Sequence, residues 1–417
     1  MSKNLSFNVS SVPRDWLIIP CGVFFKEKSI KNTEGEMNLS VYRDYGVIPK
    51  DSRDDNHNRV SEDTSNYKLV EPGDFVLNKM KGWSGSLGVS DYRGIVSPSY
   101  TVLEPVREIH NKYFHYLLRS ETYRQMYESL SYGVRIGQWE LRYHDFKQIL
   151  SLYPPIDEQK LISRYLDKKT NQIDSLVEKI HKKIELLKEQ RTSLINHYVT
   201  KGLDPNVEMK DSGIEWIGEI PKDWDVQRIS TLYSQTSVRG FSEEQNLSVF
   251  RDHGVVRRDD YENKNVLSDD LSNYKLVNQG DLVLNKMKTW MGSLGVSEYR
   301  GIVSPAYYVL RPNFEFFSGY LHHLLRSKIY IDQYASVSKG VRPGQWDLSY
   351  DEFKSLKVIL PPIDEQKETY NRLTKELQFN SQLSNLESKK IEFLKEYRQS
   401  LISSIVTGQI RVTEDTI

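Results

Sequence analysis

The sequence predicts an α+β protein in which two copies of a globular α/β domain are separated by two long helices. Asp157 to Thr200 contains no Pro or Gly and has a heptad pattern of apolar residues, which indicates a long helix that pairs with another. The chain also repeats itself, with most of its first half recurring about 207 residues later. If the two helices pair as an antiparallel coiled coil, the whole chain is expected to have pseudo-two-fold symmetry, like a symmetric dimer.

The first long helix is expected to begin just after the double proline Pro154-Pro155, because Asp157 and Glu158 suit the positive end of a helix dipole. Lys and Glu fill most of the other faces, so the apolar stripe is too narrow for a core helix and the helix needs a partner. The stripe consists of Ile173, Val177, Ile180, Ile184, Leu187, Leu194 and Tyr198, with Arg191 as its one polar position.

The partner is the stretch from Asp364 to Thr407, which also follows a double proline. The block Pro154 to Lys160 (PPIDEQK) recurs there as Pro361 to Lys367. The second stripe is poorer, so we expect the two helices to pair with an imperfect seam. Asn380, Ser384 and Glu387 stand where the first helix has Ile173, Val177 and Ile180.

The globular part of the chain is duplicated as well. Ser65 to Tyr100 recurs as Ser272 to Tyr307 with 29 of 36 positions identical, a repeat far longer than that of a solenoid. We therefore divide the chain into a first domain (1–155), a central helical region (156–202), a linker with a second domain (203–362) and a C-terminal helical region (363–417). Short strands are expected at Tyr67–Val70, Phe75–Asn78, Ile95–Val96 and Tyr100–Leu103, and a helical region at Asn111–Leu130.

Composition points to a soluble cytoplasmic protein. The single cysteine, Cys21, excludes an internal disulfide and fits a reducing compartment. No apolar run approaches a membrane span, and the N-terminus has no signal-peptide pattern. The net charge is zero, which argues mildly against binding nucleic acid through the bulk field of the protein.

Motifs for catalysis are absent from the sequence: there is no Walker A loop, no GxGxxG and no HExxH. Glu158 and Lys160 imitate the ExK of a metal nuclease, but a helix N-terminus explains them fully. His322 and His323 lie in a helical stretch and are expected to be structural. We therefore predict a non-catalytic chain without a metal or a cofactor of its own.

The positive signal is a set of basic and aromatic residues on repeated loops, where Lys and Arg can position phosphates and Arg and Gln can read base edges. A structural alternative stays open, in which Trp83 and Trp290 belong to the core and Asn78 and Asn285 only cap turns. The candidate DNA-binding residues are Arg43, Lys79, Lys81, Trp83, Tyr92, Arg93, Arg135 and Gln138 in the first copy, and Arg251, Lys286, Lys288, Trp290, Tyr299, Arg300, Arg342 and Gln345 in the second.

The chain resembles the specificity (S) subunit of type I restriction–modification systems over nearly its whole length. The resemblance rests on the two GVRxGQW…PPIDEQK blocks (Gly133 to Lys160 and Gly340 to Lys367), on the lead-in Asp211 to Pro221 (DSGIEWIGEIP), and on the helix ends Leu187 to Thr200 and Leu394 to Thr407. The first copy lacks the full lead-in and starts only at Val12-Pro13.

The resemblance implies that each globular unit is a target recognition domain for double-stranded DNA and that the subunit is not catalytic. It implies that the helices form an antiparallel spacer, which docks DNA methyltransferase (M) subunits, expected to be two, and restriction (R) subunits. S-adenosylmethionine, ATP and Mg²⁺ would belong to those partners, which would also supply much of the phosphate contact, so this chain need not be strongly basic.

Because the two domains are close copies, we expect a bipartite target with two similar, inverted half-sites. A second hypothesis is a cytoplasmic coiled-coil scaffold whose duplicated domains bind protein. Neighbouring genes for an adenine methyltransferase and a helicase-like nuclease would favour the first hypothesis. A third option, a bifunctional restriction enzyme, is disfavoured by the missing motifs.

Overall fold

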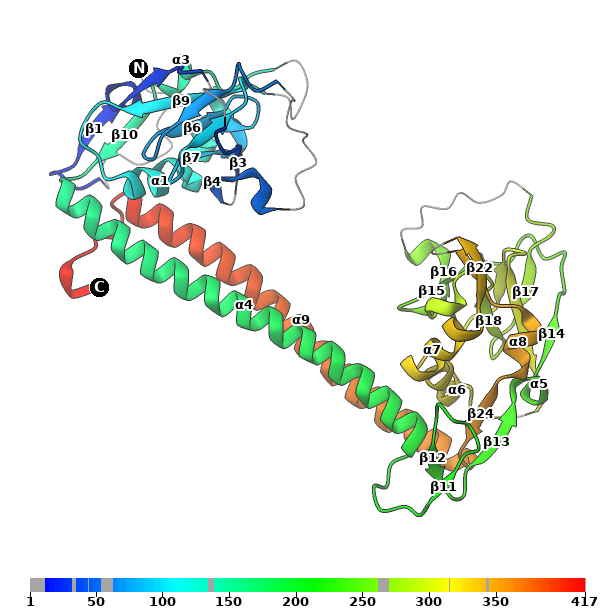
Figure 1. Ribbon diagram of the computed structural model, residues 1–417. Helices are drawn as coiled ribbons and strands as arrows, with labels where there is room; N and C mark the ends of the chain where they lie inside the picture. The colour runs from blue at the N-terminus through cyan, green and yellow to red at the C-terminus, as the bar shows by residue number, and fades with distance from the viewer. Residues whose placement is uncertain are drawn as a thin grey trace. The chain divides into compact units, whose positions relative to one another are not determined.

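The structure, a computed structural model, describes residues 12–31, 35–43, 45–53, 63–133, 139–261, 270–314, 316–342 and 345–416 (Figure 1). It divides into two compact units. Unit 1 comprises Met1–Ile180 and Ser388–Ile417, and unit 2 comprises His181–Glu387. Two long helices, α4 (Ile156–Lys201) and α9 (Ile363–Val406), therefore contribute one half to each unit.

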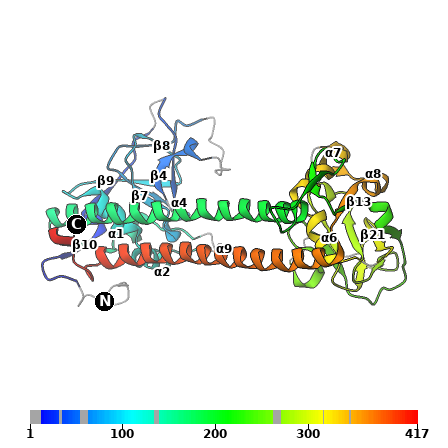
Figure 2. The ribbon, with the colours of Figure 1, turned by 90° about the horizontal axis from the view of Figure 1, so that it is seen from below.

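In unit 1 the first half of α4 packs against the last half of α9, and Figures 1 and 2 show these helices side by side. Arg398 of α9 forms an ion pair with Asp174 of α4 at 3.1 Å. Just beyond α9, Arg411 pairs with Glu158, near the start of α4, at 3.2 Å. Later residues of α9 thus meet earlier residues of α4, which makes the pairing antiparallel, as predicted.

In unit 2 the same antiparallel order holds, and the seam is imperfect, as the sequence predicted. Glu387 is buried and forms an ion pair with Lys183 at 2.8 Å. Asn380 is also buried, and its side-chain amide donates a hydrogen bond to the carbonyl oxygen of Leu187 at 3.1 Å. Two polar side chains therefore occupy seam positions that the first helix fills with Ile173 and Ile180.

The globular part of unit 1 is built on a four-stranded antiparallel sheet with the order β2-β9-β6-β7, next to the antiparallel pairs β3–β4, β5–β8 and β1–β10. Its elements are β1 (Leu17–Pro20), η2 (Cys21–Val23), β2 (Phe25–Lys28), β3 (Leu39–Tyr42), β4 (Gly46–Pro49), η3 (Lys50–Ser52), β5 (Lys68–Val70), β6 (Phe75–Asn78), η4 (Gly82–Ser84), β7 (Leu87–Val89), β8 (Gly94–Val96), β9 (Tyr100–Pro105), α1 (Asn111–Arg119), α2 (Glu121–Leu130), α3 (Tyr143–Phe146), β10 (Leu150–Tyr153) and, after α9, η7 (Glu414–Thr416).

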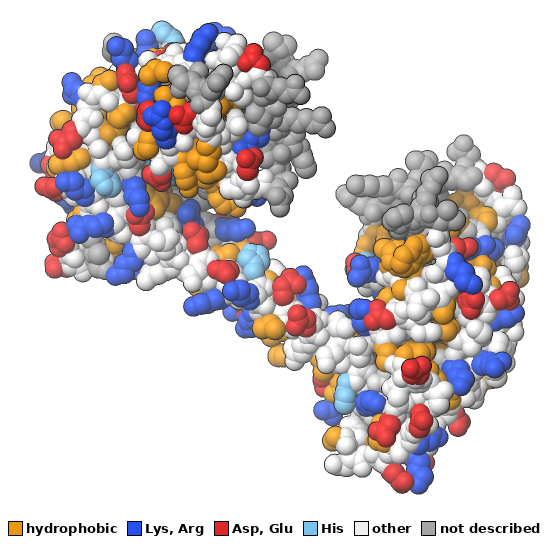
Figure 3. All heavy atoms as spheres, viewed as in Figure 1, with side chains coloured by type: hydrophobic (Ala, Val, Ile, Leu, Met, Phe, Trp, Pro, Cys, Tyr) orange, Lys and Arg blue, Asp and Glu red, His pale blue; other side chains and the backbone are white. Residues whose placement is uncertain are grey.

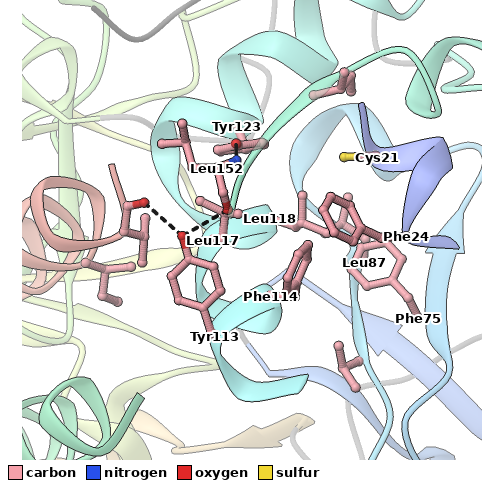
Figure 4. Close-up of a cluster of buried hydrophobic side chains, with 14 of the residues drawn as sticks. Cys21, Phe24, Phe75, Leu87, Tyr113, Phe114, Leu117, Leu118, Tyr123 and Leu152 are labelled. Atoms are coloured by element: carbon pink, nitrogen blue, oxygen red, sulfur yellow. Dashed lines mark hydrogen bonds between the residues drawn. The ribbon is translucent and has the colours of Figure 1, made fainter. Parts of the chain in front are cut away.

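The core of unit 1 joins this domain to its helices (Figure 4). Tyr113 of α1 is fully buried, and its hydroxyl donates hydrogen bonds to the carbonyl oxygens of Leu152, at 3.1 Å, and Val406, at 3.4 Å. One side chain thus ties α1 to strand β10 and to the end of α9. Phe24 and Phe114 pack beside it, with ring centroids 5.1 Å apart.

The helical region predicted at Asn111–Leu130 is two helices, because the chain turns at Ser120. The Ser120 backbone is extended, and its hydroxyl donates to the carbonyl oxygen of Leu117 at 2.7 Å, which satisfies one of the free acceptors at the end of α1. An apolar period alone could not locate this break.

Unit 2 repeats the arrangement, with a four-stranded sheet of order β14-β21-β18-β19. The hydroxyl of Tyr320, the copy of Tyr113, donates to the carbonyl oxygen of Val199 at 2.9 Å. The elements are β11 (Met209–Asp211), β12 (Glu219–Pro221), β13 (Asp225–Arg228), α5 (Ile229–Leu232), β14 (Tyr233–Thr236), β15 (Leu247–Phe250), β16 (Gly254–Arg257), η5 (Arg258–Asp260), β17 (Lys275–Val277), β18 (Leu282–Asn285), η6 (Thr289–Met291), β19 (Leu294–Val296), β20 (Gly301–Val303), β21 (Tyr307–Pro312), α6 (Ser318–Leu325), α7 (Lys328–Val337), β22 (Lys339–Arg342), β23 (Gln345–Asp347), α8 (Tyr350–Ser355) and β24 (Lys357–Leu360).

The repeated PPIDEQK block attaches each long helix to its domain. The indole nitrogen of Trp16 donates to Glu158 at 3.1 Å, and Trp224 donates to Glu365 at 3.0 Å. The buried Gln159 amide donates to the carbonyl oxygen of Pro154 at 2.8 Å and accepts the backbone N–H of His110 at 2.9 Å. These contacts give the block a structural role.

Candidate nucleic-acid interface

In unit 1 the candidate lysines lie on the loop between β6 and β7. The side-chain oxygen of Asn78 accepts the backbone N–H groups of Met80 and Lys81 at 3.1 and 3.2 Å, which folds the loop back on itself. Lys79 is half-buried and Lys81 is exposed. Asn78 therefore caps the turn, which is the structural alternative raised from the sequence, and the turn presents the two lysines.

Trp83 connects this loop to the segment that begins at Trp139. It is half-buried, its indole nitrogen donates to the carbonyl oxygen of Met80 at 3.1 Å, and its ring lies 5.3 Å from that of Trp139. The backbone N–H of Leu141 donates to the carbonyl oxygen of Lys79 at 2.9 Å. Arg135 and Gln138 lie outside the described residues, but the described chain resumes at Trp139, against the lysine loop.

Unit 2 repeats these contacts. Trp290 lies 4.9 Å from Trp346, and the N–H of Leu348 donates to the carbonyl oxygen of Lys286 at 3.2 Å. Lys286 is half-buried, Lys288 is exposed, and the Nζ atom of Lys286 sits 4.6 Å from the ring centre of Tyr308. Arg342 of β22 and Gln345 of β23 are partners across the hairpin that leads to Trp346.

A further lysine, half-buried in unit 1 and buried in unit 2, lies beneath each loop, and the sequence analysis missed both. The Nζ atom of Lys68 donates to the carbonyl oxygen of Tyr100 at 2.9 Å, and that of Lys275 donates to the carbonyl oxygen of Tyr307 at 2.6 Å. Their recurrence at equal places in both copies was the available signal.

The pKa of each of these two lysines, Lys68 and Lys275, is lowered. Burial is the main cause for both lysines. For Lys68, the positive charge of Lys79 lowers the pKa further, and the negative charge of Glu27 partly opposes this. For Lys275, the positive charges of Lys286 and then Arg239 lower the pKa further. Each loop therefore holds lysines close enough to repel one another, a cost that a bound anion would offset.

The hairpin tips carry Arg43 and Arg251, both exposed. Arg119 of α1 donates to the carbonyl oxygen of Arg43, and Arg326, which follows α6, donates to that of Arg251 at 2.6 Å. Gly292, which follows η6 on the lysine loop, lies close to the side chain of Arg251. A Cβ atom added to this glycine would be 3.9 Å from Cγ of Arg251. In unit 2 the tip of the β15–β16 hairpin is thus a neighbour of the lysine loop.

The remaining candidates form a separate turn, and their arginines are already bonded to protein. Arg93 pairs with Glu36 at 2.9 Å and with Glu71 at 2.5 Å. Arg300 pairs with Glu244 and donates to the side-chain oxygen of Asn278, both at 2.8 Å.

Of the two neighbouring tyrosines, Tyr92 is 38% exposed, and the guanidinium of Arg257 lies 4.9 Å from the ring centre of Tyr299. Arg93 and Arg300 would have to exchange their carboxylate or amide partners for phosphate or base contacts, so they are weaker candidates than the lysines.

Across the face shown in Figure 3, basic and acidic side chains are interspersed, in keeping with a net charge of zero. Within the described ranges we find no group of three or more His, Cys, Asp or Glu side chains placed to hold a metal ion, and no helix long and apolar enough to cross a membrane. The lysine loops, with their paired tryptophans, are suited to holding a polyanion.

Comparison with known proteins gives a consistent result. Residues 23–186 match the family model described as the type I restriction modification DNA specificity domain. The type I restriction enzyme MjaVIII specificity subunit of Methanocaldococcus jannaschii is 24% identical over 425 residues, covering 96% of this chain and 94% of that protein.

Two solved structures share the fold. The HsdS subunit from Thermoanaerobacter tengcongensis has a TM-score of 0.55 at 14% identity, covering 96% of this chain and 98% of the other. A chain from a study of complex assembly and conformational transition of the type I R-M system has a TM-score of 0.62 at 15% identity. The match covers 96% of this chain and 99% of the other. Specificity subunits of these systems are non-catalytic. Residues 23–186 thus match the DNA specificity domain of type I restriction–modification systems, and the whole chain is similar to the specificity subunits of these systems.

Proposed function

We propose that this specificity subunit reads a bipartite target in double-stranded DNA, one half-site with each domain, and does no chemistry itself. The observation that carries the proposal is the same asparagine-capped loop in both units, with two lysines, a tryptophan pair and a third lysine beneath it. Exposed Lys81 and Lys288, with Lys79 and Lys286 beside them, would contact phosphates. Arg135 and Arg342, in the repeated GVRxGQW segments, would contact base edges.

The two half-sites are similar and inverted, because the two reading surfaces are close copies. In the loop from Asn78 to Ser84 only two of seven positions differ from Asn285 to Met291, namely Gly82 against Thr289 and Ser84 against Met291. Surfaces this similar favour similar base sequences, and an antiparallel helix pair suits an inverted order of half-sites.

The long helices would dock the methyltransferase subunits, of which we propose two, and restriction subunits would join them. Support comes from large apolar side chains that α9 leaves exposed at steps of seven residues. Phe379 is 68% and Leu386 57% exposed in unit 2, and Phe393 is 67% exposed in unit 1. Soluble monomers seldom expose such a row, so a partner surface is expected there. S-adenosylmethionine, ATP and Mg²⁺ would bind to those partners.

Coexpression with the methyltransferase subunit of the same system tests the proposal. We expect the purified complex to methylate DNA at a defined bipartite sequence, and this chain alone to give no methylation. Phe379→Ser combined with Phe393→Ser should reduce recovery of the complex at unchanged thermal stability of the chain. A methyltransferase subunit that modifies the same sequence without this chain would refute the proposal.

A further inference from the structure

Unit 2 contains a cavity that lies apart from the lysine loops, between the start of α6, the β19–β20 turn and the paired helices. Its volume is about 500 Å³, within the range of small-molecule sites. Arg191 of α4, His322 and His323 of α6, and Tyr370 of α9 line it. Ser318 and Gly319, the first residues of α6, also line it, so the positive end of that helix faces the space.

The cavity contains an arginine that no carboxylate pairs with directly within the described part of the chain. This residue, Arg191, is exposed. The pKa of His323 is lowered to about 4, chiefly by burial and then by the positive charge of Arg326. The positive charge of Arg191 adds a smaller effect, so Arg191 lies close to this histidine. His322 is likewise kept neutral, chiefly by burial, with a pKa of about 3. One acidic side chain, Glu298, lines the cavity.

At the equivalent place in unit 1 the protein supplies carboxylates of its own. Lys112, the counterpart of Gly319, pairs with Asp167 at 2.7 Å, and the hydroxyl of Tyr116, the counterpart of His323, donates to Asp167 at 2.8 Å. Arg398, the counterpart of Arg191, pairs with Asp174 at 3.1 Å.

Unit 2 has lost both of these carboxylates. Thr374 stands in place of Asp167 and Ser381 in place of Asp174, whereas Asp91 keeps an acidic counterpart in Glu298. The duplication thus left one copy with its arginine paired and the other with an arginine facing an open space.

We propose that the cavity of unit 2 binds a phosphate group, held by Arg191 and the start of α6. A phosphate would replace the negative charge that Asp167 and Asp174 supply in unit 1. A guanidinium group and helix N–H donors match the shape and charge of a phosphate, and the neutral imidazole of His323 can donate one further hydrogen bond. The inference goes beyond the proposed function and does not depend on it, because no DNA-reading residue takes part.

His322 gives the site a connection to the rest of the domain. Its ring nitrogen lies 3.0 Å from Nη1 of Arg326, the arginine that holds the hairpin tip carrying Arg251. A bound phosphate would therefore order the side chains behind that hairpin. No matching effect is expected in unit 1, where Asp167 and Asp174 already pair with the basic side chains.

The test is the thermal midpoint of the full chain against rising inorganic phosphate, with chloride used to hold the ionic strength constant. The midpoint of the wild-type chain should rise with phosphate, because a ligand of the folded state stabilises it by mass action. Arg191→Ala should weaken the apparent affinity at least about tenfold, as expected for loss of a charged hydrogen-bond donor. Arg398→Ala, the matched variant in unit 1, should keep the wild-type response relative to its own baseline.

Two further variants distinguish phosphate in this cavity from phosphate on the lysine loops. Thr374→Asp, at an exposed position of α9, restores the missing carboxylate and should abolish the phosphate response while the chain stays folded. Lys286→Ala removes a proposed DNA contact and should leave the response intact. A wild-type midpoint that moves no more in phosphate than in chloride overturns the proposal, as does a response that Lys286→Ala abolishes and Arg191→Ala preserves.

Discussion

Asn380 of α9 donates a hydrogen bond to the backbone carbonyl oxygen of Leu187 in α4 at 3.1 Å, from within the seam between the two helices. Its counterpart in α4 is Ile173, which is buried among apolar side chains of the unit 1 core. A polar residue at one seam position fixes the register of a coiled coil and lowers its stability. Asn380 therefore sets which residues of α4 and α9 face one another in unit 2.

Replacing Asn380 with Leu should stabilise the chain. Burial of the new side chain contributes about 1.5–3 kcal/mol, and loss of the hydrogen bond costs about 1 kcal/mol. We expect a net gain on the order of 1 kcal/mol, measured by denaturant unfolding. The matched variant Ile173→Asn should destabilise the chain by about 3 kcal/mol, because it buries an amide in an apolar site. Equal losses for the two variants would rule out the proposed role of Asn380.

Glu365 should make stability depend on pH in the opposite sense to a typical paired carboxylate. Its pKa is raised, mainly by burial and further by Glu368 and Asp223, although the hydrogen bond from Trp224 opposes this. The ionised form is therefore disfavoured in the folded chain, and stability is lost as the pH rises through the raised pKa. Glu365→Gln should match or exceed the wild-type thermal midpoint at pH 7, and its advantage should vanish below pH 4.5, the ordinary pKa of this carboxyl.

The control for this prediction is Glu158→Gln in the first copy. Glu158 accepts the same hydrogen bond from a tryptophan, but it also pairs with Arg411 at 3.2 Å. Loss of that ion pair should lower stability at pH 7 by about 1 kcal/mol or less. If both variants shifted the midpoint in the same direction, the different surroundings of the two glutamates would not be controlling their behaviour.

Removal of a loop lysine should weaken DNA binding without changing which sequence is bound. For Lys79→Ala and Lys286→Ala we expect lower affinity for all duplexes and a salt dependence whose slope falls by about 0.9 for each lost phosphate contact. Fluorescence anisotropy at several salt concentrations measures both quantities. Lys354→Ala, at a lysine that pairs with Asp351 at 2.6 Å, serves as the control. Unchanged slopes for the two loop variants would remove these lysines from the interface.

Shortening the helices should alter the gap between half-sites and leave the half-sequences unchanged. Deletion of one heptad from the stretch Asp157–Thr200, with the matching heptad of α9, removes about 10 Å of helix, close to three base pairs of DNA. We expect a gap that is shorter by that amount, or loss of binding, when methylated sites of the variant complex are mapped. An altered half-sequence with the original gap would count against a spacer role.

The sequence predicted the large features because they depend on repetition. The limits of the long helices were right to within one residue at each end, since the double prolines and Gly202 mark them. The polar seam positions were visible because the second helix could be compared with the first. The break at Ser120 was not, because the extended backbone of this residue interrupts the helix within a continuous apolar period.

The candidate site was harder to predict because partners decide whether a basic residue is available. Arg93 and Lys79 look equally suitable in the sequence, yet Arg93 is paired with Glu36 and Glu71, which lie 57 and 22 residues away along the chain. Lys68 was overlooked because it lies within a strand, where its partial burial next to Lys79 depends on tertiary packing.

Duplicated reading of DNA is tested most directly by single-molecule sequencing of a host that carries this chain and its methyltransferase subunit. Two copies of one recognition surface predict methylated adenines within two similar half-sequences, in inverted order, on either side of a fixed gap. Methylation within two unrelated half-sequences would contradict the inference that the duplicated domains read alike.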